Sequence, residues 1–262
     1  MELPKFNHFL YEERGPVAIF TANRPEVLNA LNYACWDDLA AFAEYLDKAG
    51  HLRCAIITGA GDKAFIAGAD VNNINAGHGV SSLHNSGLRR AYAALENCSK
   101  PVICAVNGYC LGGGLELACA CDIRVASENA SFGLPETKLG ILPGAGGTQR
   151  LSRLVGLGVA KDVVLAGRIL SAQEAYQYGL VMKVVPKGQA LDAAMDAADK
   201  VIKRGPVALD LAKKVLNASM YTDPNTGIFM ESLSLAVLME TQDRLEGSSA
   251  FLEKRQANFK GE

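Results

Sequence analysis

Four short apolar segments constrain the fold more than any other feature of the sequence. They are GPVAIFTANRP (15–25), LRCAIITGAG (52–61), PVICAVNGY (101–109) and CDIRVAS (121–127). Short apolar runs bounded by turn-forming residues are typical of β-strands. Because these runs are apolar on both faces, we expect the strands to be buried on both sides of a sheet.

Amphipathic segments separate the predicted strands. Residues 33–49 and 83–98 carry apolar side chains at helical spacing. Strands that alternate with helices in this way predict the α/β class. From about residue 190 onward helical patterns dominate. We therefore expect two regions: an α/β core over 1–195 and a helical C-terminal region over 196–262.

The composition argues against several classes of protein. The 262 residues include 26 Lys and Arg and 28 Asp and Glu, so the net charge is −2 and no basic field attracts nucleic acid or acidic lipid. The N-terminus does not resemble a signal peptide, and the apolar runs are too short to span a bilayer. We therefore expect a cytoplasmic protein without nucleic-acid or membrane partners.

The cysteines and histidines do not form a metal-binding pattern. Seven cysteines occur without a C-x-x-C, and the four histidines are scattered. We expect reduced, buried cysteines and no metal site. G-x-G-x-x-G, G-x-x-x-x-G-K-[ST] and G-x-S-x-G are also missing from the sequence, so no cofactor and no serine nucleophile are predicted.

The segment CLGGGLELACACD (110–122) places three glycines before a short apolar helix. One interpretation is that the glycines let this helix pack closely on a sheet. The other is that their backbone N–H groups, at the positive end of the helix, stabilise a developing oxyanion. The glycines alone leave both interpretations open.

Glu116 is the ionisable group in this apolar segment, and we expect it to be buried. A buried carboxylate needs a partner, such as Arg124 or Arg150, or it has a raised pKa and acts as a general acid or base. Glu136, in the loop-like SFGLPETKLG (131–140), is by itself typical of a solvated carboxylate. Together, two glutamates beside glycine amides could add water across a polarised double bond.

Several spaced motifs resemble the enoyl-CoA hydratase, or crotonase, family nearly end to end. These motifs are NRPEVLNALN (23–32), AFIAGAD (64–70), KPVICAVNGYCLGGGLELACACDIRVAS (100–127), SFGLPETKLGILPGAGGTQRL (131–151) and EGSSAFLEKRQANF (246–259). The resemblance implies a crotonase-like spiral of ββα units. It also implies a helical C-terminal region that builds a homotrimer or a dimer of trimers and covers the site.

The resemblance also implies roles for individual residues. Glu116 and Glu136 match the two catalytic glutamates, the amides of Ala69 and Gly113 match the oxyanion hole, and Gly144 matches a residue that helps to hold the water. The positions expected along the CoA moiety are Ala67, Gly68, Asp70 and Val71, with Arg24 and Lys63 as candidates for its phosphates, and Phe251 and Lys254 reaching the CoA of a neighbouring subunit.

The expected reaction is reversible hydration of trans-2-enoyl-CoA to 3-hydroxyacyl-CoA, with the acyl-CoA thioester as substrate. Glutamates at both positions favour a hydratase over an isomerase, which often keeps only one. Another activity of the family, or a cyclic acyl group, remains an alternative. RNA-binding members use a lysine-rich helix, whereas residues 83–98 here carry only Arg89 and Arg90 as basic side chains.

Overall fold

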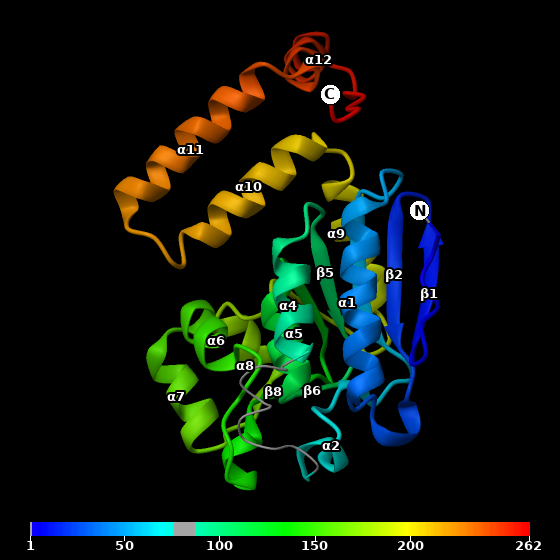
Figure 1. The fold of residues 1–262 in the computed structure, drawn as a ribbon, viewed down its shortest axis with the longest axis vertical. Coiled ribbons are helices and arrows are strands. Elements are labelled where there is room, and N and C mark those ends of the chain that lie inside the picture. Colours follow the sequence, from blue (N-terminus) through cyan, green and yellow to red (C-terminus); the bar gives the residue numbers. More distant parts are fainter. Residues whose placement is uncertain (1, 76–86) are drawn as a thin grey trace.

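A six-stranded sheet forms the centre of the computed structural model, which describes residues 2–75 and 87–262 (Figure 1). Its order is β1-β2-β3-β5-β7-β10. The strands are β1 (Phe9–Arg14), β2 (Val17–Ala22), β3 (Cys54–Gly59), β5 (Val102–Val106), β7 (Ile123–Ser127) and β10 (Lys183–Val185). β1 and β2 are antiparallel, and the other neighbours are parallel. The four apolar segments are therefore buried neighbours in one sheet, and the predicted α/β class is confirmed.

A second, smaller sheet lies beside the first. Its order is β4-β6-β8-β9, with strands β4 (Ala64–Ile66), β6 (Tyr109–Leu111), β8 (Ser131–Gly133) and β9 (Leu170–Ser171). β4, β6 and β8 each follow a strand of the large sheet, in the order β3-β4, β5-β6 and β7-β8. The chain thus repeats a pair of strands three times as it winds along the two sheets, which is the spiral that the resemblance implied.

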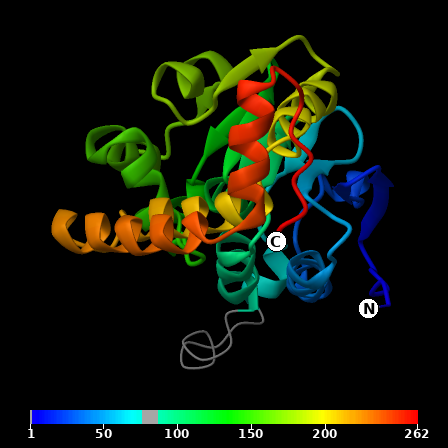
Figure 2. The same ribbon diagram turned by 90° about the horizontal axis from the view of Figure 1, so that it is seen from above.

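Helices cover both faces of the large sheet (Figures 1 and 2). α1 (Tyr33–Lys48) and α4 (Gly87–Asn97) share one buried cluster with Phe20 and Ile57. α9 (Ala190–Val201) packs on the other face against Ile19 and Ile56. Alternate residues of β2 and β3 therefore enter different apolar layers, as the two-residue period of a strand requires.

Short helices connect the strand pairs and surround the small sheet. They are η1 (Pro25–Val27), α2 (Val71–Asn75), α5 (Gly113–Ala120), η2 (Pro135–Leu139), α6 (Gly147–Val155), α7 (Leu157–Leu165) and α8 (Ala172–Gln177). The helix predicted over 83–98 corresponds to α4 from Gly87 onward, and its first positions lie outside the described residues. All seven cysteines are buried and free, as expected.

Three C-terminal helices project from the α/β part (Figures 1 and 2). They are α10 (Pro206–Ala218), α11 (Pro224–Met239) and α12 (Gln242–Leu252). α10 is fastened to the core by Lys213, whose Nζ lies 2.8 Å from Oδ2 of Asp122. In the described part of the chain, no helix is long and apolar enough to cross a membrane.

Candidate functional site

The glycine run places the start of α5 directly against β4. A Cβ on Gly114 would lie 2.1 Å from the carbonyl oxygen of Ile66, so no side chain fits there. Gly112, the N-cap, has a φ of +53°, which glycine adopts without strain. The close-packing interpretation is therefore correct. It does not exclude the other, because the first N–H groups of α5, beginning with Gly113, have no acceptor within the helix.

The backbone nitrogen of Ala69 lies close to Gly113. Ala69 forms a parallel β-bridge with Leu31, in which Leu31 N–H donates to Gly68 O and Asp70 N–H donates to Leu31 O, both across 2.9 Å. In this pattern the N–H of Ala69 itself points away from Leu31. A Cβ built on Gly113 would lie 3.8 Å from the nitrogen of Ala69. Two residues that are far apart in sequence thus approach each other at the start of α5.

Glu116 is held by a backbone turn rather than by a side chain. It lies on α5, is 3% exposed, and its Oε1 accepts the N–H groups of Ala145 and Gly147 across 2.7 and 2.8 Å. Gly146, between these donors, has a φ of +104°, and Gly147 begins α6. Converging N–H groups at a left-handed turn and a helix N-terminus form a site that favours a negative charge.

Neither arginine considered from the sequence is the direct partner of Glu116. Arg150 pairs with Glu96, with 2.7 Å between Nη2 and Oε2. Arg124 donates to the carbonyl oxygens of Leu180, Ala118 and Cys121. Burial raises the pKa of Glu116, while the two amides and the charge of Arg150 act in the opposite direction. Glu116 is therefore a buried carboxylate that accepts two backbone N–H groups, with Arg150 as a more distant cation.

Glu136 lies on η2 in a different environment. It is half-buried, and within the described residues its Oε2 is buried without a hydrogen-bond partner. Its Oε1 would lie 3.2 Å from a Cβ on Gly112, so its carboxyl group approaches the start of α5. Burial raises the pKa of Glu136 to about 7, and the charge of Glu116 adds to this effect. The structure thus brings the two predicted glutamates to one place, with unequal hydrogen bonding.

A family model described as enoyl-CoA hydratase/isomerase matches residues 12–262. The chain belongs to the enoyl-CoA hydratase/isomerase family. The short-chain-enoyl-CoA hydratase of Clostridium acetobutylicum is 42% identical over 96% of this chain and 97% of its own length. The 2,3-dehydroadipyl-CoA hydratase of Escherichia coli is 44% identical over 94% of this chain and 95% of its own length.

A solved structure from the enoyl-CoA hydratase/isomerase family confirms the fold. The crystal structure of an enoyl-CoA hydratase from Bacillus anthracis superposes with a TM-score of 0.93 at 41% identity, covering 98% of this chain and 100% of that one. The crotonase-like fold that the sequence motifs implied is therefore correct.

Residues 67–71, the segment that the sequence motifs assign to CoA, include Ala69. Within it, Gly68 is buried, Ala67 and Asp70 are half-buried, and Val71 is exposed. Asp70 forms an ion pair with Arg24 across 3.4 Å, and both side chains are mostly buried. Lys63 is exposed. Arg24 therefore already has a carboxylate partner, whereas Lys63 extends into solvent.

Three further predicted residues do not contact Glu116 directly. Gly144 is exposed and immediately precedes Ala145, the donor to Glu116. Phe251 is 83% exposed at the end of α12, and Lys254 follows with a φ of +55°. Figure 1 shows α12, which contains Phe251, well separated from α5, which contains Glu116.

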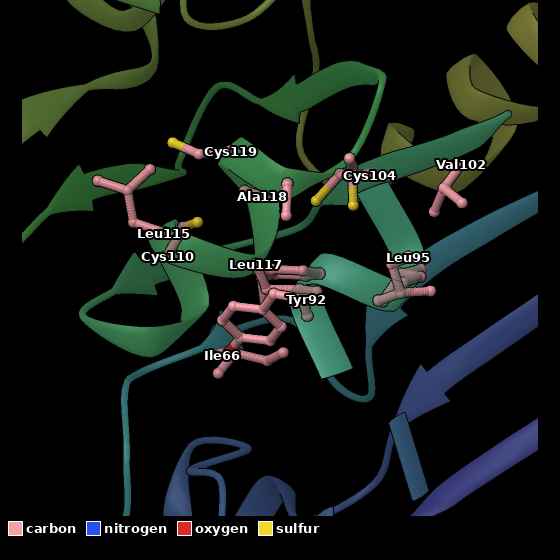
Figure 3. Close-up of a cluster of buried hydrophobic side chains, with 14 of the residues drawn as sticks. Ile66, Tyr92, Leu95, Val102, Cys104, Cys110, Leu115, Leu117, Ala118 and Cys119 are labelled. Carbon is pink, nitrogen blue, oxygen red and sulfur yellow. The ribbon is translucent and has the colours of Figure 1, made fainter. Parts of the chain in front are cut away.

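Sequence reasoning missed the residues that support the site within this enoyl-CoA hydratase/isomerase fold. Ala145 and Gly147 hold Glu116, and the hydroxyl of fully buried Tyr92 donates to the carbonyl oxygen of Gly113 across 2.6 Å. Figure 3 shows Tyr92 beside Leu117 of α5. The glycines of PGAGG were the available signal for a turn of unusual backbone shape, but nothing in the sequence marked Tyr92.

Proposed function

We propose that the protein reversibly adds water to trans-2-enoyl-CoA thioesters and forms 3-hydroxyacyl-CoA. The observation that carries this proposal is the meeting of Glu116 and Glu136 beside the backbone amides of Ala69 and Gly113. Hydration needs groups that activate water, supply a proton and stabilise negative charge on the thioester oxygen. These four residues can provide all three functions.

In this proposal, the amides of Ala69 and Gly113 bind the thioester oxygen. Attack at the β-carbon moves electrons onto this oxygen and produces an enolate-like state. Amides fixed by a β-bridge and a helix start require little reorganisation as that charge develops. Loss of one such donor typically lowers the rate by about 10²–10³-fold.

The two carboxyl groups would divide the proton transfers. Burial raises the pKa of Glu116, but the two N–H groups on its Oε1 favour the anionic form, which is suited to take a proton from water. Glu136, whose pKa is raised to about 7, is suited to carry a proton near neutral pH and to deliver it to the α-carbon. Gly144, next to the turn that holds Glu116, would help to position the water. This chemistry calls for the thioester and water, with no added cofactor.

The CoA moiety would lie along the segment that contains Ala67, Gly68, Asp70 and Val71. Lys63, which is exposed beside β4, is suited to meet a CoA phosphate. Arg24 would do so only by sharing its guanidinium with Asp70. Phe251 and Lys254 would contribute from a neighbouring subunit, since α12 is well separated from α5 of the same chain in Figure 1.

We propose that the C-terminal region, residues 196–262, assembles a trimer or a pair of trimers. None of the residues of α11 is buried, although the helix is rich in large apolar side chains. Its exposed apolar residues are Ile228, Phe229, Leu233, Leu235, Val237 and Met239. An uncovered face of this kind is typical of a protein interface. Light scattering of the purified protein would measure a trimeric or hexameric mass, and a monomer would contradict the proposal.

A spectrophotometric assay tests the activity. The purified protein is mixed with crotonyl-CoA, longer 2-enoyl-CoAs up to C16, cyclic enoyl-CoAs and 2,3-dehydroadipyl-CoA, which gives the Escherichia coli relative its name. We expect the enoyl-thioester absorbance to fall with at least one of these substrates. No loss of absorbance with any member of the series would contradict the proposed function.

A further inference from the structure

A buried ion pair lies behind the turn that holds Glu116. The guanidinium of Arg150, on α6, contacts both oxygens of Glu96, at the end of α4, with 2.9 Å from Nε to Oε1 and 2.7 Å from Nη2 to Oε2. The two side chains are only 9% and 13% exposed. Such a two-pronged pair fixes the plane and the position of the guanidinium.

The third prong of Arg150 contacts the turn itself. Its Nη1 donates to the carbonyl oxygen of Ala145 across 2.9 Å. A Cβ on Gly146 would lie 2.1 Å from the same Nη1, so the guanidinium occupies the space of a side chain at 146. Residues 145–147 are therefore held between Arg150 on one side and Oε1 of Glu116 on the other.

We infer that Glu96 and Arg150 are positioning residues that place Glu116 for the proposed hydration by fixing the turn at residues 145–147. The inference rests on the proposed function. Arg150 acts in two ways: it fixes the direction of the N–H donors of Ala145 and Gly147, and its positive charge favours the anionic form of Glu116. Glu96 orients the guanidinium and partly offsets its charge.

Other charged or titratable groups also act on Glu116 and must stay constant in a test. Glu136 on η2, Tyr92 on α4 and Cys119 on α5 itself interact electrostatically with it. Neither Arg150→Gln nor Glu96→Gln alters these three side chains. A change in the titration of Glu116 in those variants would therefore arise from the ion pair or from the turn.

The inference predicts opposite effects of the two substitutions on the pH profile. Arg150→Gln removes the cation, so the acidic limb of the kcat profile, on which Glu116 ionises, should move to higher pH by roughly one unit. Glu96→Gln leaves the cation less compensated, so that limb should move to lower pH. Loss of the fixed turn should also lower kcat of Arg150→Gln by about 10²-fold, with a smaller effect on KM.

Arg124→Gln is the matched control, because Arg124 is also buried and donates to backbone carbonyls but does not contact residues 145–147. It should leave the acidic limb in place. If Arg150→Gln does not fold, Arg150→Lys replaces it. This variant keeps the charge but cannot reproduce the three-pronged geometry, so it should lower kcat with little movement of the limb.

The experiment measures kcat and KM for crotonyl-CoA between pH 5 and pH 9, about two units either side of neutral. An infrared titration follows the carboxyl band of Glu116, which is assigned by its loss in Glu116→Gln. Unchanged limbs for Arg150→Gln and Glu96→Gln, shifts of these two in the same direction, an equal shift in the Arg124 control, or an unchanged kcat for Arg150→Lys would overturn the inference. The infrared titration does not require turnover, so an inactive wild type would count against the proposed function while the positioning of Glu116 is still tested.

Discussion

The backbone N–H of Gly147 donates to Oε1 of Glu116 across 2.8 Å, and position 147 has no room for a side chain. A Cβ there would lie 2.9 Å from Cγ and 3.0 Å from Oε1 of Glu116. The donor that orients the carboxylate is thus also in direct steric contact with it, so even one methyl group at 147 changes the position of Glu116.

Gly147→Ala is therefore expected to reduce activity much more than stability. The methyl group would also lie 3.0 Å from Cβ of Pro143, but the more flexible side chain of Glu116 should move first. This movement misplaces the carboxylate, and kcat should fall by about 10²-fold. Gly158→Ala is the matched control, because a Cβ at Gly158 meets nothing within 4 Å. Steady-state kinetics and thermal unfolding of both variants measure the effect. Comparable kcat values for the two would show that Glu116 does not depend on this contact.

Substitution of each glutamate tests the division of roles. Glu116→Gln keeps an oxygen that can accept the N–H groups of Ala145 and Gly147, and Glu136→Gln keeps the size of a half-buried side chain. Both proteins should fold and lose about 10²–10⁴-fold in kcat, the usual contribution of a general acid or base. Circular dichroism confirms folding, and crotonyl-CoA kinetics give the rates. Two variants with rates near that of the wild type would rule out the two-carboxylate mechanism.

The raised pKa of Glu136 predicts how stability depends on pH. Because its pKa is about 7 in the folded chain and 4.5 in an ordinary environment, the folded state binds the proton more tightly than the unfolded state. The stabilisation that protonated Glu136 contributes to the folded state is fully present below about pH 4.5 and is lost as the pH rises towards 7. Glu136→Gln should therefore become more stable than the wild type over this interval, and the difference should level off above it.

Urea unfolding of the wild type and of Glu136→Gln at several pH values measures this difference. Glu174→Gln serves as the comparison, since the pKa of Glu174 is lowered to about 2 by the Ser171 cap and by Arg168. That substitution should instead destabilise the protein at neutral pH. A stability difference for Glu136→Gln that does not vary between pH 4.5 and pH 7 would mean that Glu136 has an ordinary pKa.

Tyr92→Phe tests the support beneath Gly113. The substitution removes a 2.6 Å hydrogen bond from a buried hydroxyl to the carbonyl oxygen of Gly113 and leaves the aromatic packing in place. We expect a loss of about 1 kcal/mol in the free energy of unfolding, typical of one such bond. Denaturant titration checks this value. An unchanged or increased stability would show that the bond does not contribute to holding the start of α5.

The elements that sequence reasoning predicted well are those with a strong local pattern. The strands around Ile19, Ile56 and Ile103 were clear because their short runs are apolar on both faces and therefore need burial on both sides of a sheet. The strands of the second sheet were not found, since β4, β6 and β8 have three residues each and no measurable alternation. Their repetition is a property of the backbone path and leaves no repeated sequence.

The site was predicted in part for a similar reason. The environment of Glu116 follows from its own helix, and its burial was visible in the sequence. Its real partners, Ala145 and Gly147, come from a turn whose shape depends on Gly146 and on Arg150, which donates to the carbonyl oxygen of Ala145. Arg124 and Arg150 were candidates for a direct ion pair with Glu116. Sequence alone could not show that Arg150 instead contacts the backbone turn that holds Glu116.

Isotope incorporation tests the central claim, that the two glutamates add water across a 2-enoyl thioester, most directly. Crotonyl-CoA is incubated with the protein in H₂¹⁸O and, separately, in D₂O, and the product is analysed by mass spectrometry. We predict a 3-hydroxybutyryl-CoA that carries ¹⁸O at C3 in the first case and deuterium at C2 in the second, with both signals greatly reduced in Glu116→Gln and Glu136→Gln. Deuterium at C2 without ¹⁸O at C3, or equal incorporation by the wild type and both variants, would contradict it.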